Sequence, residues 1–295
     1  MRERVTVACV QAESVQLDLE ATIDKLDGLV AEAAARGAQL AVFPEAFLPT
    51  YPSSRWARFL AGGSDAKPVF ARLARESVEI PGPAAERLAD VARQHEIWLA
   101  VGANELERGT IYNALLLYSP EGRLALHRRK LVPTNHERLV WGQGDGRGLR
   151  AIETPLGRLG GLICWENQMP LARFALYESG VEIYLAPTAD DSDAWHDSLR
   201  HIARESRAFV VSPCVFQRAS SYPDDVPIAD GPELLGRGGS AILAPDGTYL
   251  AGPLWDEEGI LVAELDPERL YAERQRFDPA GHYHRPDVLS LRVRR

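Results

Sequence analysis

Cysteine is scarce in this sequence, and its spacing excludes two classes of protein. Only three cysteines occur, Cys9, Cys164 and Cys214. No two of them form a C-x-x-C pair and their number is odd, so neither a disulfide framework nor a zinc knuckle is indicated. Each thiol therefore has to be judged by its own surroundings.

Long apolar runs and runs of like charge are also missing. No stretch approaches the ~18 consecutive apolar residues of a membrane span. The polar start Met-Arg-Glu-Arg leads into an apolar stretch without the core of a signal peptide. The formal net charge of −9 and the pI near 5.4 argue against nucleic acid or an anionic membrane as a partner. We expect a cytoplasmic protein.

The remaining composition is that of an ordinary globular chain, with 45% hydrophobic and 25% charged residues. A chain of 295 residues can bury a sizeable core, and α/β chains of this length often form one domain. We therefore expect a single domain over residues 1–295. Its core is expected at about 4–270, followed by a C-terminal tail at 271–295 that is polar, aromatic and irregular from Arg274.

Apolar strands alternate with amphipathic helices along the chain. Helices are predicted from Leu19 to a stop at Gly37, through Leu88 and Val91, from Pro170, and around Trp195 to Ser206. Strands are predicted at 5–10, 40–43, 97–102, 111–118, 123–128, 159–163, 181–186, 209–216, in a hairpin around 245–247, and at 259–265. About ten strands suffice for a four-layer α-β-β-α sandwich, and a single large mixed sheet remains the alternative.

Cys164 has the most suggestive position of the three cysteines. It follows an apolar strand and precedes a helix that opens at Pro170. A side chain at such a corner lies close to backbone N–H groups, which favour a thiolate or an oxyanion. Cys9 and Cys214, predicted in mid-strand, are better interpreted as small buried hydrophobes.

Two charged residues at other strand ends have the chemistry that a thiol nucleophile needs. Pro44 ends one strand and presents Glu45, while Lys130 stands just before Pro133 ends the pattern of another. A partly dry carboxylate takes up a proton, and a nearby lysine stabilises developing negative charge. Taken singly, each would more often be a surface charge.

Two other patterns do not indicate a cofactor or metal site. The glycine-rich stretch at 142–146 lacks the strand before and the helix after it that a nucleotide loop requires, so it predicts a turn. His282 and His284 lack a third metal ligand and are interpreted as tail packing. We predict no metal and no organic cofactor.

Three segments together resemble the nitrilase superfamily. They are FPEAFLPTYP (43–52), RKLVPTNHERLVWGQGDG (129–146) and CWENQMP (164–170), and the last two are similar to its true nitrilase branch. Further similar stretches, at 195–210, 236–253 and 281–288, extend the resemblance over nearly the whole chain.

The resemblance implies the α-β-β-α sandwich and a catalytic triad. Glu45 is the implied general base, Lys130 the charge stabiliser and Cys164 the nucleophile. Glu137 matches a second glutamate that many members place beside the triad, although a solvated carboxylate is the rival interpretation. Tyr51, His136, Trp165 and Trp195 lie near the motifs and are candidate substrate-binding residues, although aromatic residues near strand ends more often belong to the core.

The predicted activity is hydrolysis of a small-molecule nitrile to the carboxylic acid and ammonia, through thioimidate and thioester intermediates on Cys164. An amidase or N-carbamoyl hydrolase with the same triad is the alternative enzyme. A catalytically silent binding or assembly protein is disfavoured because all three triad residues are present. The resemblance also implies a homodimer or higher homo-oligomer, and the short stretch after residue 288 argues against long filaments.

Overall fold

The first apolar run of the chain forms β1 (Val5–Gln11), which has a different neighbour on each face. Ala8 and Val10 pack with Ile23 of the following helix, whereas Val7 and Cys9 belong to a separate apolar cluster. Alternating side chains of a strand point to opposite faces of the sheet, so β1 is covered on both faces. The computed structural model describes residues 1–61 and 66–294 of the chain.

β1 lies in a sheet of six strands with the order β13-β1-β2-β3-β4-β5. β1, β2 and β3 are parallel, and the other pairs are antiparallel. The other strands are β2 (Leu40–Val42), β3 (Trp98–Glu107), β4 (Thr110–Tyr118), β5 (Leu124–Arg129) and β13 (Gly259–Leu265).

The second sheet has seven strands, in the order β10-β11-β9-β8-β7-β6 with β12 also paired to β11. Here β7, β8 and β9 are parallel. The bounds are β6 (Ile152–Thr154), β7 (Gly157–Gly161), β8 (Ile183–Leu185), β9 (Phe209–Ser212), β10 (Phe216–Arg218), β11 (Leu234–Leu243) and β12 (Tyr249–Trp255).

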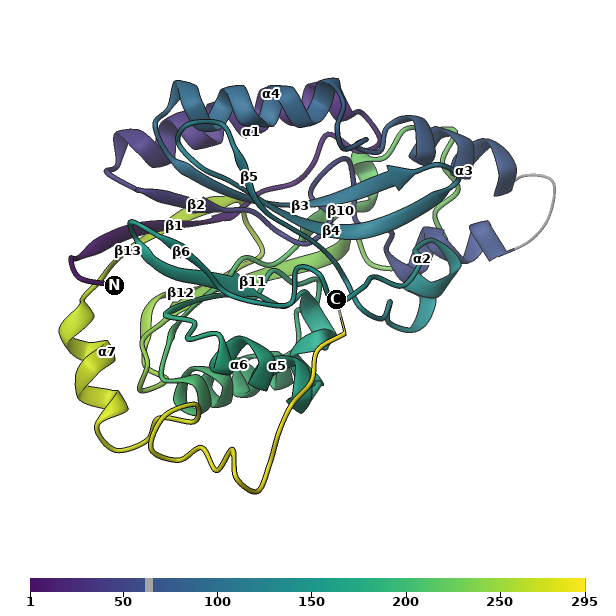
Figure 1. The fold of residues 1–295 in the computed structure, drawn as a ribbon. Helices are drawn as coiled ribbons and strands as arrows, with labels where there is room; N and C mark the ends of the chain where they lie inside the picture. The colour runs from purple at the N-terminus through teal and green to yellow at the C-terminus, as the bar shows by residue number, and fades with distance from the viewer. Residues whose placement is uncertain (62–65, 295) are drawn as a thin grey trace.

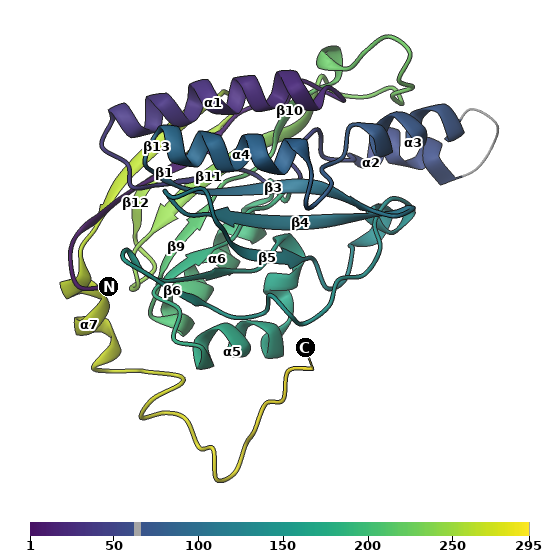
Figure 2. The same cartoon turned by 45° about the horizontal axis from the view of Figure 1, so that its top comes forward.

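Helices cover the outer face of each sheet (Figures 1 and 2). α1 (Leu19–Ala35) and α4 (Pro83–Gln94) cover the first sheet, and α5 (Pro170–Glu178) and α6 (Asp193–Ser206) cover the second. Three apolar clusters fill the spaces between these four layers, and the middle one joins Val7 and Leu40 of the first sheet to Ile183 and Phe209 of the second. The expected four-layer sandwich is confirmed.

The remaining helices lie at the edges of the sandwich. α2 (Ser54–Ala57) and α3 (Ala66–Arg75) project together at one end, and α7 (Pro267–Arg274) follows β13 (Figure 1). The chain after α7 is irregular and runs back beneath α5. No helix within residues 1–61 and 66–294 is both long enough and apolar enough to cross a membrane.

Two details of the predicted strands were wrong. The strand expected at 209–216 is divided into β9 and β10, because Pro213 between them has no N–H to donate to a sheet ladder. Cys214 is therefore not in mid-strand but forms an isolated bridge with Thr188. α7, which was not predicted, begins with a capping Asp266 and Pro267 and ends at Arg274, the residue from which an irregular tail was expected.

Candidate active site

Glu45 lies just beyond the end of β2, in a bend that the neighbouring strand approaches closely. A Cβ at Gly102 of β3 would lie 2.2 Å from the carbonyl oxygen of Pro44, so this contact requires a glycine. The Glu45 side chain is fully buried, and Asn113 of β4 donates a hydrogen bond to its Oε1 (2.8 Å). Its Oε2 has no hydrogen-bond partner among the described residues.

Burial decides the protonation of this carboxyl group. The loss of solvent raises the pKa of Glu45 to about 7, against the opposing charge of Lys130 and with a further upward contribution from Glu137. Near neutral pH, both the acid and the carboxylate form of Glu45 are therefore populated. This behaviour suits a group that has to accept and return protons.

Lys130 follows β5 and bridges two carboxylates. Its Nζ donates to Glu45 Oε1 (2.8 Å) and to Glu137 Oε2 (2.6 Å), and all three side chains are buried. Burial alone would lower the pKa of Lys130, but the negative charges around it outweigh burial and raise the pKa above its usual range. Lys130 is therefore a permanent cation in the site.

Glu137 lies in the short 3-10 helix Asn135–Leu139. Its Oε2 accepts from the Thr134 N–H (2.6 Å), and its Oε1 accepts from the Tyr51 hydroxyl (2.9 Å). Only 1% of the residue is exposed, so it is not the solvated carboxylate of the rival interpretation. The structure brings Glu137 together with Lys130, whose ammonium group it contacts as Glu45 does.

Cys164 begins a 3-10 helix (Cys164–Gln168) between β7 and α5, with a backbone φ of 51°. This left-handed conformation is uncommon for a residue other than glycine, and such residues are frequent at active sites. The Thr188 hydroxyl donates to Cys164 Sγ (3.2 Å). Burial, reinforced by Glu45, raises the pKa of Cys164 above its usual value, so the resting group is a thiol.

The three acidic groups lie within reach of one another. Cys164 Sγ and one carboxylate oxygen each from Glu45 and Glu137 are within 4.8 Å of one another. Such a set could in principle hold a divalent cation. The ammonium group of Lys130 already lies between the two carboxylates, however, and supplies the positive charge that they require.

The four candidate substrate-binding residues differ in their surroundings. Tyr51 is half-buried against Glu137, and its ring meets the edges of His136 and Trp141. Trp165 is 52% exposed, and its indole N–H donates to Asp190 (2.9 Å). Trp195 is only 1% exposed and packs in the cluster between the second sheet and its helices, where its indole N–H donates to Ser212.

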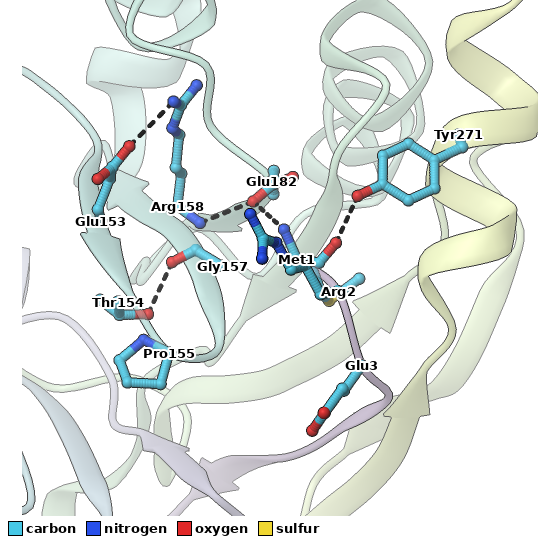
Figure 3. A pocket seen from close by; sticks show the side chains of 10 residues that line it. All are labelled: Met1, Arg2, Glu3, Glu153, Thr154, Pro155, Gly157, Arg158, Glu182 and Tyr271. Carbon is cyan, nitrogen blue, oxygen red and sulfur yellow. Dashed lines mark hydrogen bonds and ion pairs between the residues drawn. The ribbon is translucent and has the colours of Figure 1, made fainter.

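Two cavities differ in what lines them. One of about 10 Å³ has Glu45, Tyr51 and Gln217 in its wall, which is room for a single water molecule. Another, of about 710 Å³, lies between the first residues of the chain, the β6–β7 hairpin and α7 (Figure 3). Several of its polar groups pair with one another, as in the contacts of Glu182 with the Met1 amine and of Arg158 with Glu153, and it contains no triad residue.

Sequence reasoning missed two residues that hydrogen-bond to side chains of the triad. Asn113 interrupts an otherwise apolar strand, and Thr188 follows shortly after β8. A polar side chain inside or directly after a buried strand is the signal that could have indicated them, because it must find a hydrogen-bond partner. Their actual partners depend on the neighbouring strands and were not readable from the chain.

Similarity to known proteins extends over nearly the whole chain. The model of the carbon-nitrogen hydrolase family matches residues 6–275. Nitrilase 1 of Arabidopsis thaliana is 44% identical over 98% of this chain and 86% of its own length. An aliphatic nitrilase of Sinorhizobium fredii is 44% identical over 97% of this chain and 94% of its own length.

Solved structures agree on the fold. Nit3 of Saccharomyces cerevisiae, a member of the nitrilase superfamily, superposes with a TM-score of 0.73 at 20% identity, over 96% of this chain and 97% of its own. A carbon-nitrogen hydrolase of Helicobacter pylori gives a TM-score of 0.72 at 22% identity, over 97% and 96% of the two chains. With its sequence, its fold and its buried Glu-Lys-Cys cluster in agreement, the chain belongs to the carbon-nitrogen hydrolase family and, within it, to the nitrilase branch.

Proposed function

We propose that this protein hydrolyses an organic nitrile to the carboxylic acid and ammonia, with Cys164 as the nucleophile. The observation that carries the proposal is the buried cluster in which Lys130 contacts Glu45 at 2.8 Å while Cys164 Sγ lies within 4.8 Å of that carboxylate group. The high identity to proteins named nitrilases supports a nitrile as the substrate.

The first step forms a covalent bond between Cys164 and the nitrile carbon. Glu45 in its carboxylate form takes the thiol proton as the sulfur attacks, and this proton is delivered to the nitrile nitrogen to give a neutral thioimidate. Lys130 and the Trp165 backbone N–H stabilise the charge that develops on nitrogen. The N–H groups in the first turn of a helix lack partners within that helix, so the Trp165 N–H is suited to this task.

Two water molecules complete the reaction. The first adds to the thioimidate carbon, and ammonia leaves to give a thioester. The second adds to the thioester, and the acid leaves as the Cys164 thiol is restored. In both additions Glu45 removes a proton from water and returns it to the leaving group. Its unpartnered Oε2 and the adjoining water-sized cavity support this role.

The substrate side chain is proposed to lie against Tyr51, His136 and Trp165. Tyr51 and His136 adjoin Glu137, and Trp165 follows the nucleophile with its indole held by Asp190. Trp195 is left out of this set because its indole is enclosed in an apolar cluster and hydrogen-bonded to Ser212.

Self-association is a further part of the proposal. Four large apolar side chains of α5 and the C-terminal segment are each more than three-fifths exposed: Leu171, Tyr283, Val288 and Leu289. Exposed apolar residues that gather in one region are typical of protein–protein contacts. We propose that a second copy of the chain covers them.

We also propose that the protein works in a reducing compartment such as the cytoplasm, where the free thiol of Cys164 stays reduced.

A panel of nitriles and the matching amides tests the activity. We expect ammonia from at least one nitrile, and intact protein mass is expected to increase by the acyl or thioimidate group during turnover. Cys164→Ala should give neither signal, while Cys9→Ala, which alters a buried thiol between the sheets, should give both. Brisk amide hydrolysis with no turnover of any nitrile would refute a nitrilase in favour of an amidase.

A further inference from the structure

A second buried ion pair lies beside the triad and plays no part in the steps above. Arg128 and Glu166 are 2% and 1% exposed. They form two parallel contacts, from Nη1 to Oε2 (2.7 Å) and from Nη2 to Oε1 (2.8 Å). This paired geometry fixes the orientation of both groups more firmly than a single contact would.

The two oxygens of Glu166 also accept backbone hydrogen bonds from both catalytic segments. Oε2 accepts from the N–H of Ile163 (2.8 Å), the residue before Cys164. Oε1 accepts from the N–H of Leu131 (2.6 Å), the residue after Lys130. One carboxylate thus joins the backbone on either side of the gap between nucleophile and lysine.

These two segments come from different sheets, so no strand pairing sets their distance. Lys130 follows β5 of the first sheet, and Cys164 follows β7 of the second. Arg128, itself part of β5, also donates to the carbonyl oxygen of Gly161 in β7 (3.1 Å). We propose that Arg128 and Glu166 form a positioning pair that sets Cys164 relative to Lys130 across the two sheets.

The energetics favour such a role over simple stabilisation. A buried ion pair pays a large desolvation cost, and apolar residues of similar size often stabilise a fold equally well. Here, moreover, Arg128 Nε is buried without a hydrogen-bond partner among the described residues. What apolar residues would not supply is an acceptor shared by the Ile163 and Leu131 N–H groups.

The inference rests on the proposed role of the triad, and it predicts a specific electrostatic effect. Lys130 lowers the pKa of both Glu45 and Cys164 through its charge. If Lys130 drifts away from them, both groups will hold their protons to higher pH. Cys164 will then react at higher pH than in the parent, which simple loss of folded protein would not cause.

Two variants separate positioning from folding. Glu166→Gln leaves Arg128 uncompensated and offers one oxygen to two N–H donors, so it should lower both stability and reactivity. Arg128→Met/Glu166→Gln removes both charges, so stability should largely return, yet one amide oxygen still serves two donors. Glu182→Gln is the matched control, because Glu182 also accepts from a cation, the Met1 amine, and from a backbone N–H, that of Arg158, but lines a cavity that contains no triad residue.

The readout is alkylation of Cys164 by iodoacetamide across pH, located by peptide mapping, with thermal unfolding measured in parallel. We expect the midpoint of alkylation to rise by about one pH unit in both Glu166 variants, the lower end of the shift that one neighbouring charge causes. Glu182→Gln should melt at a lower temperature, with an unchanged midpoint of Cys164 alkylation. A parental midpoint in both Glu166 variants would overturn the inference. Because alkylation needs no nitrile, absence of nitrile turnover would refute only the proposed function.

Discussion

Glu45 governs how the reaction depends on pH. Its carboxylate form accepts the thiol proton, and burial raises its pKa to about 7. We therefore expect kcat/KM to fall as pH decreases through about 7, because the base becomes protonated. Initial rates between pH 5 and 9 check this. Glu45→Gln should lose roughly 100-fold or more in kcat, the usual contribution of a general base. If kcat/KM instead fell only near the ordinary pKa of a glutamate side chain, the assigned role of Glu45 would be contradicted.

Thr188 affects the reactivity of Cys164 through a direct hydrogen bond. Its hydroxyl donates to Cys164 Sγ and lowers the pKa of Cys164. Thr188→Val removes this donor with little change of shape. We expect Cys164 in the variant to be alkylated roughly tenfold more slowly at neutral pH, since a hydrogen bond to a charged group is worth about 1.5–3 kcal/mol. Thr188→Ser keeps the hydroxyl and should retain the parental rate; equal rates in all three proteins would refute the effect.

At the scale of elements, the bend that holds Glu45 depends on a glycine in the adjacent strand. A Cβ at Gly102 would lie 2.2 Å from the Pro44 oxygen and 2.5 Å from the Ala46 nitrogen. Gly102→Ala should therefore displace Glu45, costing about 1–3 kcal/mol of stability and roughly 100-fold in kcat.

Gly109 provides the control for this substitution. It lies in the turn between β3 and β4, and an added Cβ there would meet nothing within 4 Å. Gly109→Ala should keep the parental melting temperature and activity. Parental kinetics in Gly102→Ala would show that the bend tolerates a methyl group and that the close contact is not needed.

Helices and strands were predictable from the sequence where a pattern within one segment of the chain indicated them. Periodic apolar residues located α1, and Pro44 located the strand end at Glu45. α2 was missed because it is a single turn, whereas the buried apolar residues of α3 at 66, 69 and 73 have a helical spacing that was readable. The division at Pro213 was readable, since proline lacks the N–H that a continuous strand would use.

The site was predictable as a set of residues but not as an arrangement. Glu45, Lys130 and Cys164 each carried a local signal at a strand end. Their meeting depends on how two sheets stack, and the contacts of Asn113, Thr188 and Glu166 depend on it too. Pairings between distant segments follow from the packed structure, and a single sequence does not encode them in any local pattern.

At the scale of the whole molecule, the exposed apolar residues of α5 and the C-terminal segment lead to a prediction about the oligomeric state. We expect a particle of at least twice the chain mass of 32.5 kDa in sedimentation velocity experiments. Leu171→Asp with Leu289→Asp should reduce it to the monomer, because a charge buried in an apolar contact is costly. Val15→Asp, at an exposed apolar residue before α1, should leave the assembly intact. A monomeric parent protein would refute the proposed self-association.

The pairing of two carboxylates with one ammonium group has a consequence for the end of each catalytic cycle. When Glu45 is in its carboxylate form, two acidic side chains share the single ammonium group of Lys130 inside a buried site. An uncharged nitrile enters such a site without electrostatic cost, whereas the carboxylic acid becomes an anion as soon as it ionises. Repulsion at short range in a poorly screened interior then drives the product out. The buried charges of the site thus also clear it for the next substrate.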